Sequence, residues 1–181
     1  MVAAARVFPN FTAYGSDSAF QVSPIAPQYT SGGSYLKTKR LLRGQGSIML
    51  SWAKATSSGY NYSKKTFFSL SPSEVGLVLE LLDAKVADLS LSHSANMNAS
   101  DESNAKVLQV TRASDPDGNP LVLLKIAGDM QAVASLNAGE QRALRELLVY
   151  SLPRLYGFQL VLDGPMYVVF DCTQFGIVCT C

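Results

Sequence analysis

Aromatic rings and amines alternate along one short segment, residues 60–65, which reads Tyr-Asn-Tyr-Ser-Lys-Lys. Two rings and two ammonium groups this close together could bind single-stranded nucleic acid. Unpaired bases lie flat on aromatic side chains, and cations neutralise the neighbouring phosphates. Stacking contributes about 1–3 kcal/mol per base and any base can stack, so such a surface tolerates many sequences. The segment is therefore predicted to belong to a sequence-tolerant nucleic-acid site.

Strand periodicity predicts which of these side chains share a face. If residues 60–68 form a strand, alternation places Tyr60, Tyr62 and Lys64 on one face. That face continues to Thr66 and Phe68, and the opposite face carries Asn61, Ser63, Lys65 and Phe67. Phe67 and Phe68 then point opposite ways, so at least one is expected in the core. A core position is also open to both tyrosines, with their hydroxyls reaching water.

A second strand is predicted at residues 47–54, where large apolar residues alternate with serines. Trp52 shares a face with Ile48 and Leu50. This neighbourhood favours a core position for the indole over a stacking platform.

Enzyme chemistry has no visible residues to carry it. The chain has one histidine, His93, and no G-x-S-x-G, C-x-x-C, P-loop or dinucleotide pattern. His93 is predicted to be a surface or hydrogen-bonded residue, and the adjacent acids Asp101 and Glu102 to be solvated loop charges. We therefore predict no catalytic residues, no cofactor and no small-molecule substrate.

The three cysteines lie in the last ten residues, at positions 172, 179 and 181. An odd number confined to one end predicts no disulfide framework, and no second metal-ligating pair accompanies them. No metal site is expected, and a reducing intracellular compartment is favoured.

Charge is divided unevenly along a chain whose net charge is only +1. Eight basic residues and one acid precede Ser71, whereas seven basic residues and thirteen acids follow Leu70. The basic half also contains eleven of the seventeen aromatic residues. This division predicts a basic face and an acidic face, provided that the two halves do not mix in space. The alternative for the densest basic run, Lys37 to Arg43, is a solvated loop.

The 181 residues are enough for one domain, and 48% apolar with 16% charged residues is typical of a globular protein. No apolar run approaches the roughly 20 residues of a membrane-spanning helix. The first residues, Met-Val-Ala-Ala-Ala-Arg-Val-Phe, are too short for a secretory signal or a full transit peptide.

Strands dominate the first half of the chain. Residues 11–14 and 19–29 flank Gly-Ser-Asp-Ser, which predicts a hairpin. Pro24 and Pro27 place the second arm at a sheet edge or a bend, because proline lacks a ladder donor. A helix then begins after Ser71, where Pro72 and Glu74 complete a capping box. Its apolar residues cover more than one side, so it is expected to have several neighbours.

The second half repeats this order. Strands are predicted at 86–93, 105–113, 120–128 and 131–136, with a turn at Ser-Asp-Pro-Asp-Gly-Asn and a polar loop at 94–104. Asn137 and Glu140 predict the start of a second helix, which Pro153 should kink or end. Four strands, a helix, four strands and a helix make an α+β fold.

These segments together resemble the Whirly family of single-stranded-DNA-binding proteins. The central block, YNYSKKTFFSLSPSEVGLVLEL, carries most of the resemblance. YGSDSAFQVSPIAPQY, LSHSANMNASDESNAKVLQV and LPRLYGF match further family segments in the same order. The similarity covers residues 6–158, which we take as the domain. Residues 1–5 are an N-terminal remnant, and the tail 159–181 has no counterpart that we recognise.

The resemblance implies two antiparallel four-stranded sheets packed crosswise, with helices that gather four subunits. It implies binding of single-stranded DNA, with RNA as an alternative, and no membrane. By position, the nucleic-acid-binding residues would be Tyr60, Tyr62, Ser63, Lys64 and Lys65, with Tyr14 and Trp52 as additions. The subunit-interface residues would be Val75, Leu77, Val78, Leu81, Leu82, Leu148 and Leu152.

Organelle genome maintenance, DNA repair, transcription regulation and defence responses would follow, in a plastid or mitochondrion or alternatively in the nucleus. Two other functions stay open. One is an RNA-binding or annealing factor, and the other is a non-enzymatic regulator that acts through protein partners. One departure bears on assembly, because the family hairpin has two lysines where this chain has Gly15 and Asp17. Assembly beyond four subunits is therefore in question.

Overall fold

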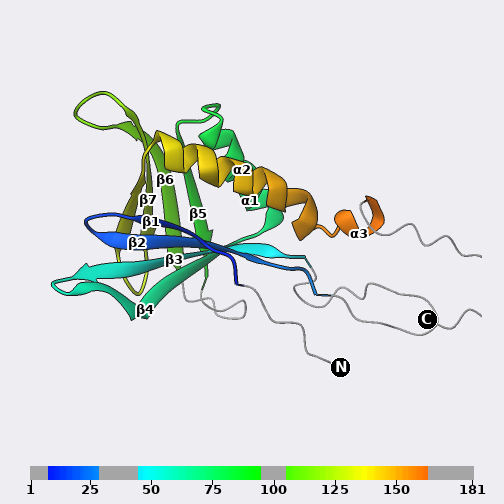
Figure 1. Ribbon diagram of the computed structural model, residues 1–181, viewed down its shortest axis with the longest axis horizontal. Coiled ribbons are helices and arrows are strands. Elements are labelled where there is room, and N and C mark those ends of the chain that lie inside the picture. The colour runs from blue at the N-terminus through cyan, green and yellow to red at the C-terminus, as the bar shows by residue number, and fades with distance from the viewer. Residues whose placement is uncertain (1–7, 29–44, 95–104, 163–181) are drawn as a thin grey trace, which may run out of the picture.

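The computed structural model describes residues 8–28, 45–94 and 105–162 (Figure 1). Several predicted features lie outside these ranges: the remnant 1–5, the run Lys37 to Arg43, Asp101 and Glu102, the cysteines, and the tail beyond residue 162. The predicted basic face draws five of its eight cations from outside the described ranges, so it stays a prediction.

Within the described residues, eight strands form two antiparallel four-stranded sheets, each in chain order. The first sheet contains β1 (Phe11–Tyr14), β2 (Ser18–Ile25), β3 (Ser47–Thr56) and β4 (Gly59–Leu70). The second contains β5 (Asp88–His93), β6 (Lys106–Ser114), β7 (Pro120–Ala127) and β8 (Ala132–Leu136). The helices are α1 (Pro72–Leu82), α2 (Ala138–Leu155) and the short α3 (Gln159–Leu162). The predicted α+β order is confirmed.

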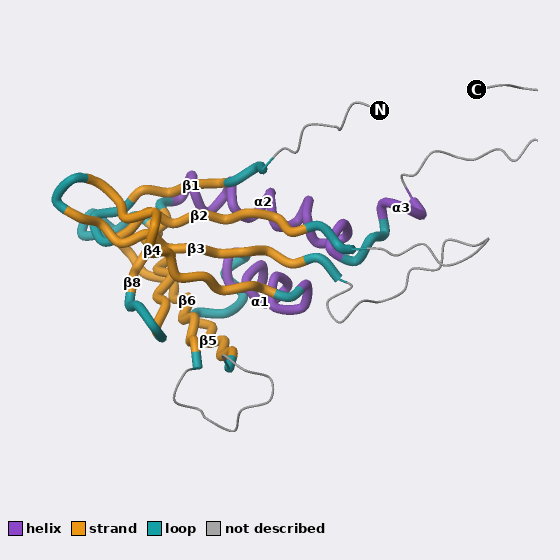
Figure 2. The backbone as a smooth tube through the Cα atoms, turned by 90° about the horizontal axis from the view of Figure 1, so that it is seen from below, coloured by secondary structure: helices purple, strands orange, loops and turns teal. Residues whose placement is uncertain are grey.

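The two sheets pack crosswise, as Figure 1 shows for β5–β7 against β1–β4. Figure 2 shows β1–β4 side by side, with the second sheet crossing them near one end. β8 packs against β1, β2 and β3, while α1 packs against α2 and both sheets. The facing sides form one hydrophobic core, whose largest buried side chains include Trp52, Phe20, Leu108 and Leu136.

Pro24 lies within β2, opposite Ile48 of β3. The pairing of β2 with β1 ends at Val22, so at Pro24 the strand has become the edge of the sheet. The missing N–H group therefore interrupts no ladder with β1. The predicted edge position is confirmed.

Both helix starts have the predicted capping boxes. Ser71 caps α1 with Glu74, and Asn137 caps α2 with Glu140. Proline at the first position of α1 loses nothing, because that N–H has no partner in a helix. α2 continues through Pro153 and ends two residues later at Leu155, so the proline marks its last turn.

Glu74 also joins the helix to the second sheet. His93, at the end of β5, has its Nε2 2.6 Å from Oε1 of Glu74, and its ring stacks on Phe68 of β4 with centroids 4.2 Å apart. His93 is thus hydrogen-bonded, as predicted. Burial acts to raise the pKa of Glu74, but hydrogen bonds from Ser71, and then His93, outweigh it and lower the pKa.

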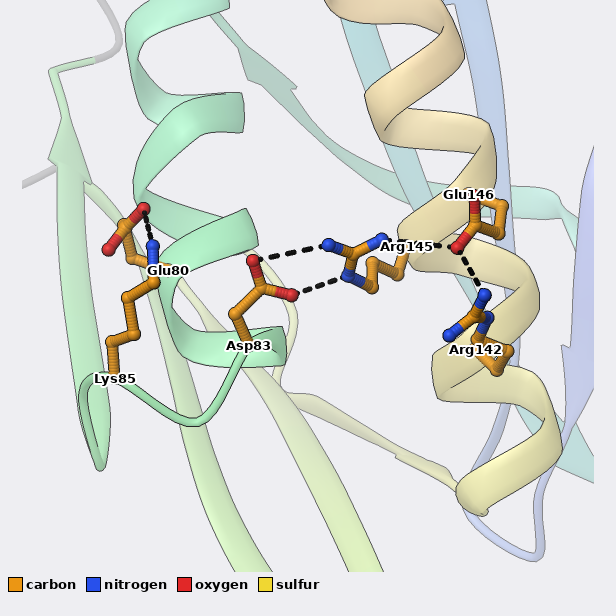
Figure 3. Close-up of polar contacts among 6 residues, drawn as sticks. All are labelled: Glu80, Asp83, Lys85, Arg142, Arg145 and Glu146. Carbon is orange, nitrogen blue, oxygen red and sulfur yellow. Dashed lines mark hydrogen bonds and ion pairs between the residues drawn. The ribbon is translucent and has the colours of Figure 1, made fainter.

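A cluster of ion pairs holds the two long helices together (Figure 3). Asp83, the last cap of α1, accepts hydrogen bonds from Nε and Nη2 of Arg145 on α2. These bonds hold the pKa of Asp83 below its usual range. Oε1 of Glu146 forms ion pairs with Nη1 of Arg145, at 3.1 Å, and with Nη2 of Arg142, at 3.0 Å. Arg145 is therefore the cation that bridges the helices, whereas Arg142 pairs only along its own helix.

Acidification should weaken the contacts that Glu74 makes with Ser71 and His93 at the start of α1. Because the pKa of Glu74 is lowered in the folded protein, the ionised carboxylate stabilises the fold near neutral pH, and that contribution is lost as the pH falls below about 4.5. Glu74→Gln should be less stable at pH 7 and lose less stability on acidification, measured by urea unfolding from pH 7 to pH 3. Glu140→Gln, which alters a capping box without a histidine, is the control. Equal pH dependence of wild type and Glu74→Gln would contradict the assignment.

The helix pair offers a second test. Arg145→Ala should lower the thermal midpoint clearly, because it leaves Asp83 without its bidentate partner. Arg142→Ala should lower it little, since exposed pairs within one helix contribute about 0.3–0.5 kcal/mol. Calorimetry of both variants provides the comparison, and an equal effect would argue against a bridge through Arg145.

Candidate nucleic-acid interface

β4 carries an irregularity that changes which side chains share a face. Its pairs with β3 run from Ile48–Leu70 to Ala53–Lys65 and resume at Ala55–Tyr60. Four residues of β4, 61–64, therefore lie opposite a single residue of β3, Lys54, so β4 has three extra residues at this point. An odd surplus of three residues reverses the alternation, because side chains alternate with a period of two.

The reversal corrects the predicted faces of β4. Thr66 and Phe68 are buried on the inner face, as alternation requires. Tyr60 and Tyr62 do not share that face, because they lie on the outer face with Lys65. The prediction that Tyr60, Tyr62 and Lys64 share a face with Thr66 and Phe68 is therefore wrong. Its physical cause is the bulge at 61–64, which single-sequence periodicity does not reveal.

Three tyrosines, Tyr14, Tyr60 and Tyr62, form what we call the tyrosine cluster. The ring centroids of Tyr14 and Tyr60 lie 5.6 Å apart, and those of Tyr60 and Tyr62 lie 6.4 Å apart. Tyr60 is half-buried and its hydroxyl donates to the carbonyl of Gly15 at 2.8 Å, so its ring is fixed. Tyr14 and Tyr62 keep 65% and 45% of their surface exposed. The pKa of Tyr62 is raised by desolvation and by its contact with the Tyr14 hydroxyl. A raised pKa keeps the Tyr62 ring neutral at neutral pH.

Lys65 supplies the cation beside these rings. Its Nζ lies 4.9 Å from the ring centroid of Tyr62, which is a cation–π distance. Lys64 and Ser63 are exposed in the bulge, and the backbone N–H of Ser63 donates to Oδ1 of Asn61. The arrangement thus brings together Tyr14, Tyr60, Tyr62 and Lys65.

Trp52 is the predicted ring that the structure places elsewhere. It is completely buried, with 0% of its surface exposed, and packs on Phe20 at a centroid distance of 5.1 Å. The prediction of Trp52 as a nucleic-acid contact is wrong, since a buried indole presents no face to a base. Its neighbours Ile48 and Leu50 had favoured the core.

Phe67 is a candidate that sequence reasoning missed. It lies on the outer face of β4, two residues from Lys65, with 48% of its surface exposed. The signal was present in the sequence, because Phe67 and Phe68 point to opposite faces of a strand. Since Phe68 is buried, Phe67 extends the aromatic surface along the sheet.

The turn at 15–17 ties this surface to the second sheet. Asp17 pairs with Lys54 at 2.7 Å, and its other oxygen accepts from the N–H of Val133 at 2.8 Å. Burial acts to raise the pKa of Asp17, but the hydrogen bonds from Lys54 and Val133 lower it overall. The buried Ser18 hydroxyl donates to the carbonyl of Val133 at 2.7 Å. These contacts hold in place the turn that accepts the Tyr60 hydrogen bond.

The predicted subunit-interface residues divide into two groups. Val75, Val78, Leu81 and Leu148 are buried within their own chain, so their prediction as interface residues is wrong. They face the core because α1 packs against both sheets and α2. Leu77 is exposed, while Leu82 and Leu152 are partly buried. Exposed apolar side chains that were not predicted lie on α2, at Leu147, Val149 and Tyr150.

No helix among the described residues is long and apolar enough to cross a membrane.

The burial of Trp52 can be tested by fluorescence, because it is the only tryptophan in the chain. Its emission should be blue-shifted and resist quenching by iodide in the folded protein, with quenching appearing on unfolding in urea. A red-shifted, readily quenched emission from the folded protein would restore Trp52 as a surface ring.

Comparison with known proteins relates this geometry to a family. A family model described as Whirly transcription factor matches residues 13–146. A potato (Solanum tuberosum) protein named single-stranded DNA-binding protein WHY1, chloroplastic, is 30% identical over 118 residues. The match covers 63% of this chain but only 40% of the potato protein, so the chain spans less than half the length of that relative.

Solved structures agree with the fold. The plant transcriptional regulator PBF-2 is 25% identical with a TM-score of 0.70, and the match covers 88% of each chain. WHY3 from Arabidopsis thaliana is 23% identical with a TM-score of 0.72, over 88% of this chain and 95% of that one. Since the family model spans well over half of the chain, the protein belongs to the Whirly family.

Proposed function

We propose that this protein binds single-stranded DNA with little sequence preference, through the outer face of its first sheet. The observation that carries the proposal is the tyrosine cluster with Lys65 beside it. The rings of Tyr14 and Tyr62 are exposed beside the fixed Tyr60 ring. The Lys65 ammonium group lies 4.9 Å from the ring centroid of Tyr62. Bases would stack on the rings and Phe67, while Lys64 and Lys65 neutralise phosphates. The potato relative, which is named as a single-stranded-DNA-binding protein, supports the same ligand.

Sequence tolerance follows from the kind of contact. Stacking uses the face of a base, which all four bases share, and carries little sequence information. Reading a base requires free donors and acceptors at its edge. The Tyr60 hydroxyl is already bonded to Gly15. Among the described residues, the Tyr60 hydroxyl therefore has no free donor with which to read a base edge.

The cellular role is part of the proposal rather than a property of the site. We infer a function in transcription regulation and organelle genome maintenance, with a plastid as the favoured location. Its support is the family description and the name of the chloroplastic potato relative. Among the described residues of this surface, none separates DNA from RNA, so RNA is an alternative ligand.

We infer further that the protein is a homotetramer assembled through its helices. Leu77 on α1 and Leu147, Val149 and Tyr150 on α2 are exposed in the single chain. The two helices that carry them pack against each other, and exposed apolar side chains that gather on one face typically mark a contact with another protein. Burial of these side chains between copies of the same chain would explain their exposure here.

Binding of fluorescein-labelled oligothymidine, measured by anisotropy, tests the ligand. Tyr62→Ala should weaken binding by about 1–3 kcal/mol, or roughly 5- to 150-fold, because one stacked base is lost. Affinity should fall steeply with salt, as for any phosphate contact. Tyr156→Ala is the matched control, since Tyr156 is 43% exposed but lies at the end of α2.

Native mass spectrometry of the same samples reports the number of subunits with and without the oligomer. Tyr62→Ala should leave that number unchanged, at four. Absence of binding by wild type at low salt would overturn the proposal. Tighter binding of a matched oligouridine would assign the site to RNA.

A further inference from the structure

Gln21 lies in the middle of the outer face of the first sheet. It belongs to β2, where it pairs with Thr12 of β1 on one side and Ser51 of β3 on the other. Ser51 in turn pairs with Phe67 of β4. Gln21 therefore lies in the same row across the sheet as the exposed ring of Phe67.

Lys65 reaches Gln21 from two strands away. Its Nζ donates to Oε1 of Gln21 at 2.5 Å. Neighbouring strands lie about 4.8 Å apart, so the Lys65 side chain must lean from β4 over β3 to meet the amide of Gln21, which extends toward it from β2. Lys65 thus does not extend from the edge of the sheet into solvent.

Small side chains on the outer face leave room for this path. Ala53 of β3 pairs directly with Lys65, and Ala19 of β2 pairs with Ala53. Ala53, Ala19 and Ser51 are all buried, although they point away from the hydrophobic core. Side chains that lie on the sheet must cover them, and the Lys65 stem and the tyrosine cluster are in position to do so. A larger residue at Ala53 would lift the lysine from the sheet.

The amide of Gln21 is oriented from its other end. Its Nε2 donates to Oγ1 of Thr12 at 3.3 Å, and the Thr12 hydroxyl donates to Oδ1 of Asn10 at 3.2 Å. With the nitrogen directed to Thr12, the oxygen faces Lys65. The ammonium group is thus located by two groups, the Gln21 oxygen and the Tyr62 ring.

We propose that Gln21 is a positioning residue for nucleic-acid binding, which fixes the Lys65 ammonium over the sheet as a preformed phosphate contact. This inference rests on the proposed function. An ammonium group has three donors, so a bond to Gln21 leaves others for a phosphate oxygen. A lysine that is already ordered loses less conformational entropy when the ligand binds. A neutral amide orders the lysine without cancelling its charge, which a carboxylate at the same position would do.

Two substitutions at Gln21 separate orientation from charge. Gln21→Met keeps the length of the side chain and removes the acceptor. It should weaken oligothymidine binding about two- to tenfold, the cost of ordering one long side chain, with an unchanged salt dependence. Gln21→Glu should pair with Lys65 and neutralise it. The slope of log affinity against log salt should then become less steep by about 0.7, the value for one phosphate contact on a single strand.

Amine labelling provides a readout that needs no nucleic acid. Acetic anhydride treatment of the free protein, followed by tandem mass spectrometry, gives the reactivity of each lysine. In wild type, Lys65 should react more slowly than the exposed Lys64, and in Gln21→Met the two should become equal. A merely structural role for Gln21 would instead lower the thermal midpoint and leave these relative reactivities unchanged.

The outcomes distinguish this role from the function on which it rests. Failure of wild type to bind the oligomer would overturn both. Binding by wild type together with wild-type affinity of Gln21→Met, or equal labelling of Lys64 and Lys65 in wild type, would overturn the role of Gln21 alone. Weaker binding, faster labelling of Lys65 and the altered salt slope of Gln21→Glu together would establish it.

Discussion

The bulge of β4 opposite Lys54 is the constraint on which the candidate interface depends. Thr66, Phe68 and Leu70 must face inward to complete the core, and a regular strand would carry Tyr60 and Tyr62 to that same side. Three surplus residues turn the start of the strand over, so both rings come to the outer face with Lys65. The strand thereby serves two demands that simple alternation cannot meet together. Its second half, residues 66–70, packs against the second sheet. Its first half, residues 60–65, brings two rings and a cation to the outer face. The bulge at 61–64 thus divides β4 into a part that packs in the core and a part that carries the candidate binding residues.

The surroundings of the bulge make that surface rigid. The Tyr60 hydroxyl is bonded to the 15–17 turn, and Asp17 and Ser18 of that region are bonded to Val133 of the second sheet. Exposed rings on a mobile hairpin would have to be ordered by the ligand, and the ordering would reduce the affinity. Here the contacts between the sheets order the turn during folding. This also gives a structural reason for Asp17, where the family hairpin has a lysine. The carboxylate pairs with Lys54 and accepts a hydrogen bond from the N–H of Val133, so its charge is compensated within the chain.

The order of helices and strands could be predicted because the strongest signals in the sequence are local, whereas the crosswise packing of the two sheets was implied only by the family resemblance. Capping boxes at Ser71 and Asn137, the turns at 15–17 and 115–119, and the strand patterns between them each predict their own element, and all agree with the structure. The candidate site was predicted less well. Tyr14, Tyr60, Tyr62 and Lys65 do come together, but Trp52 is in the core, and Phe67 and Gln21 were not selected. The wrong face of Tyr60 and Tyr62 arises because a face assignment by alternation holds only until the register shifts, and register depends on the partner strand. Trp52 and Phe67 lie outside the shifted part of the ladder, and there alternation already placed Trp52 in the core and Phe67 opposite Phe68. The prediction of subunit-interface residues on the helices was wrong for a related reason. An apolar stripe does not say whether its partner is the same chain or another, and Val75, Val78, Leu81 and Leu148 proved to pack within their own.

One strand connects the proposed ligand surface to the proposed subunit surface. β4 leads directly into α1, and the joint is fixed by the Ser71–Glu74 capping box and by His93, which bonds Glu74 and stacks on Phe68. The orientation of the ring surface relative to exposed Leu77 is therefore set by the fold of each chain. In a symmetric tetramer, identical chains would present their ring surfaces in fixed and equivalent positions. Each surface has few rings, and stacking contributes only about 1–3 kcal/mol per base. Repetition would compensate, because a strand held at one site is at high effective concentration for the next. A modest, sequence-tolerant surface on each subunit is then enough for firm binding of a long single strand, and no base-specific contact is required.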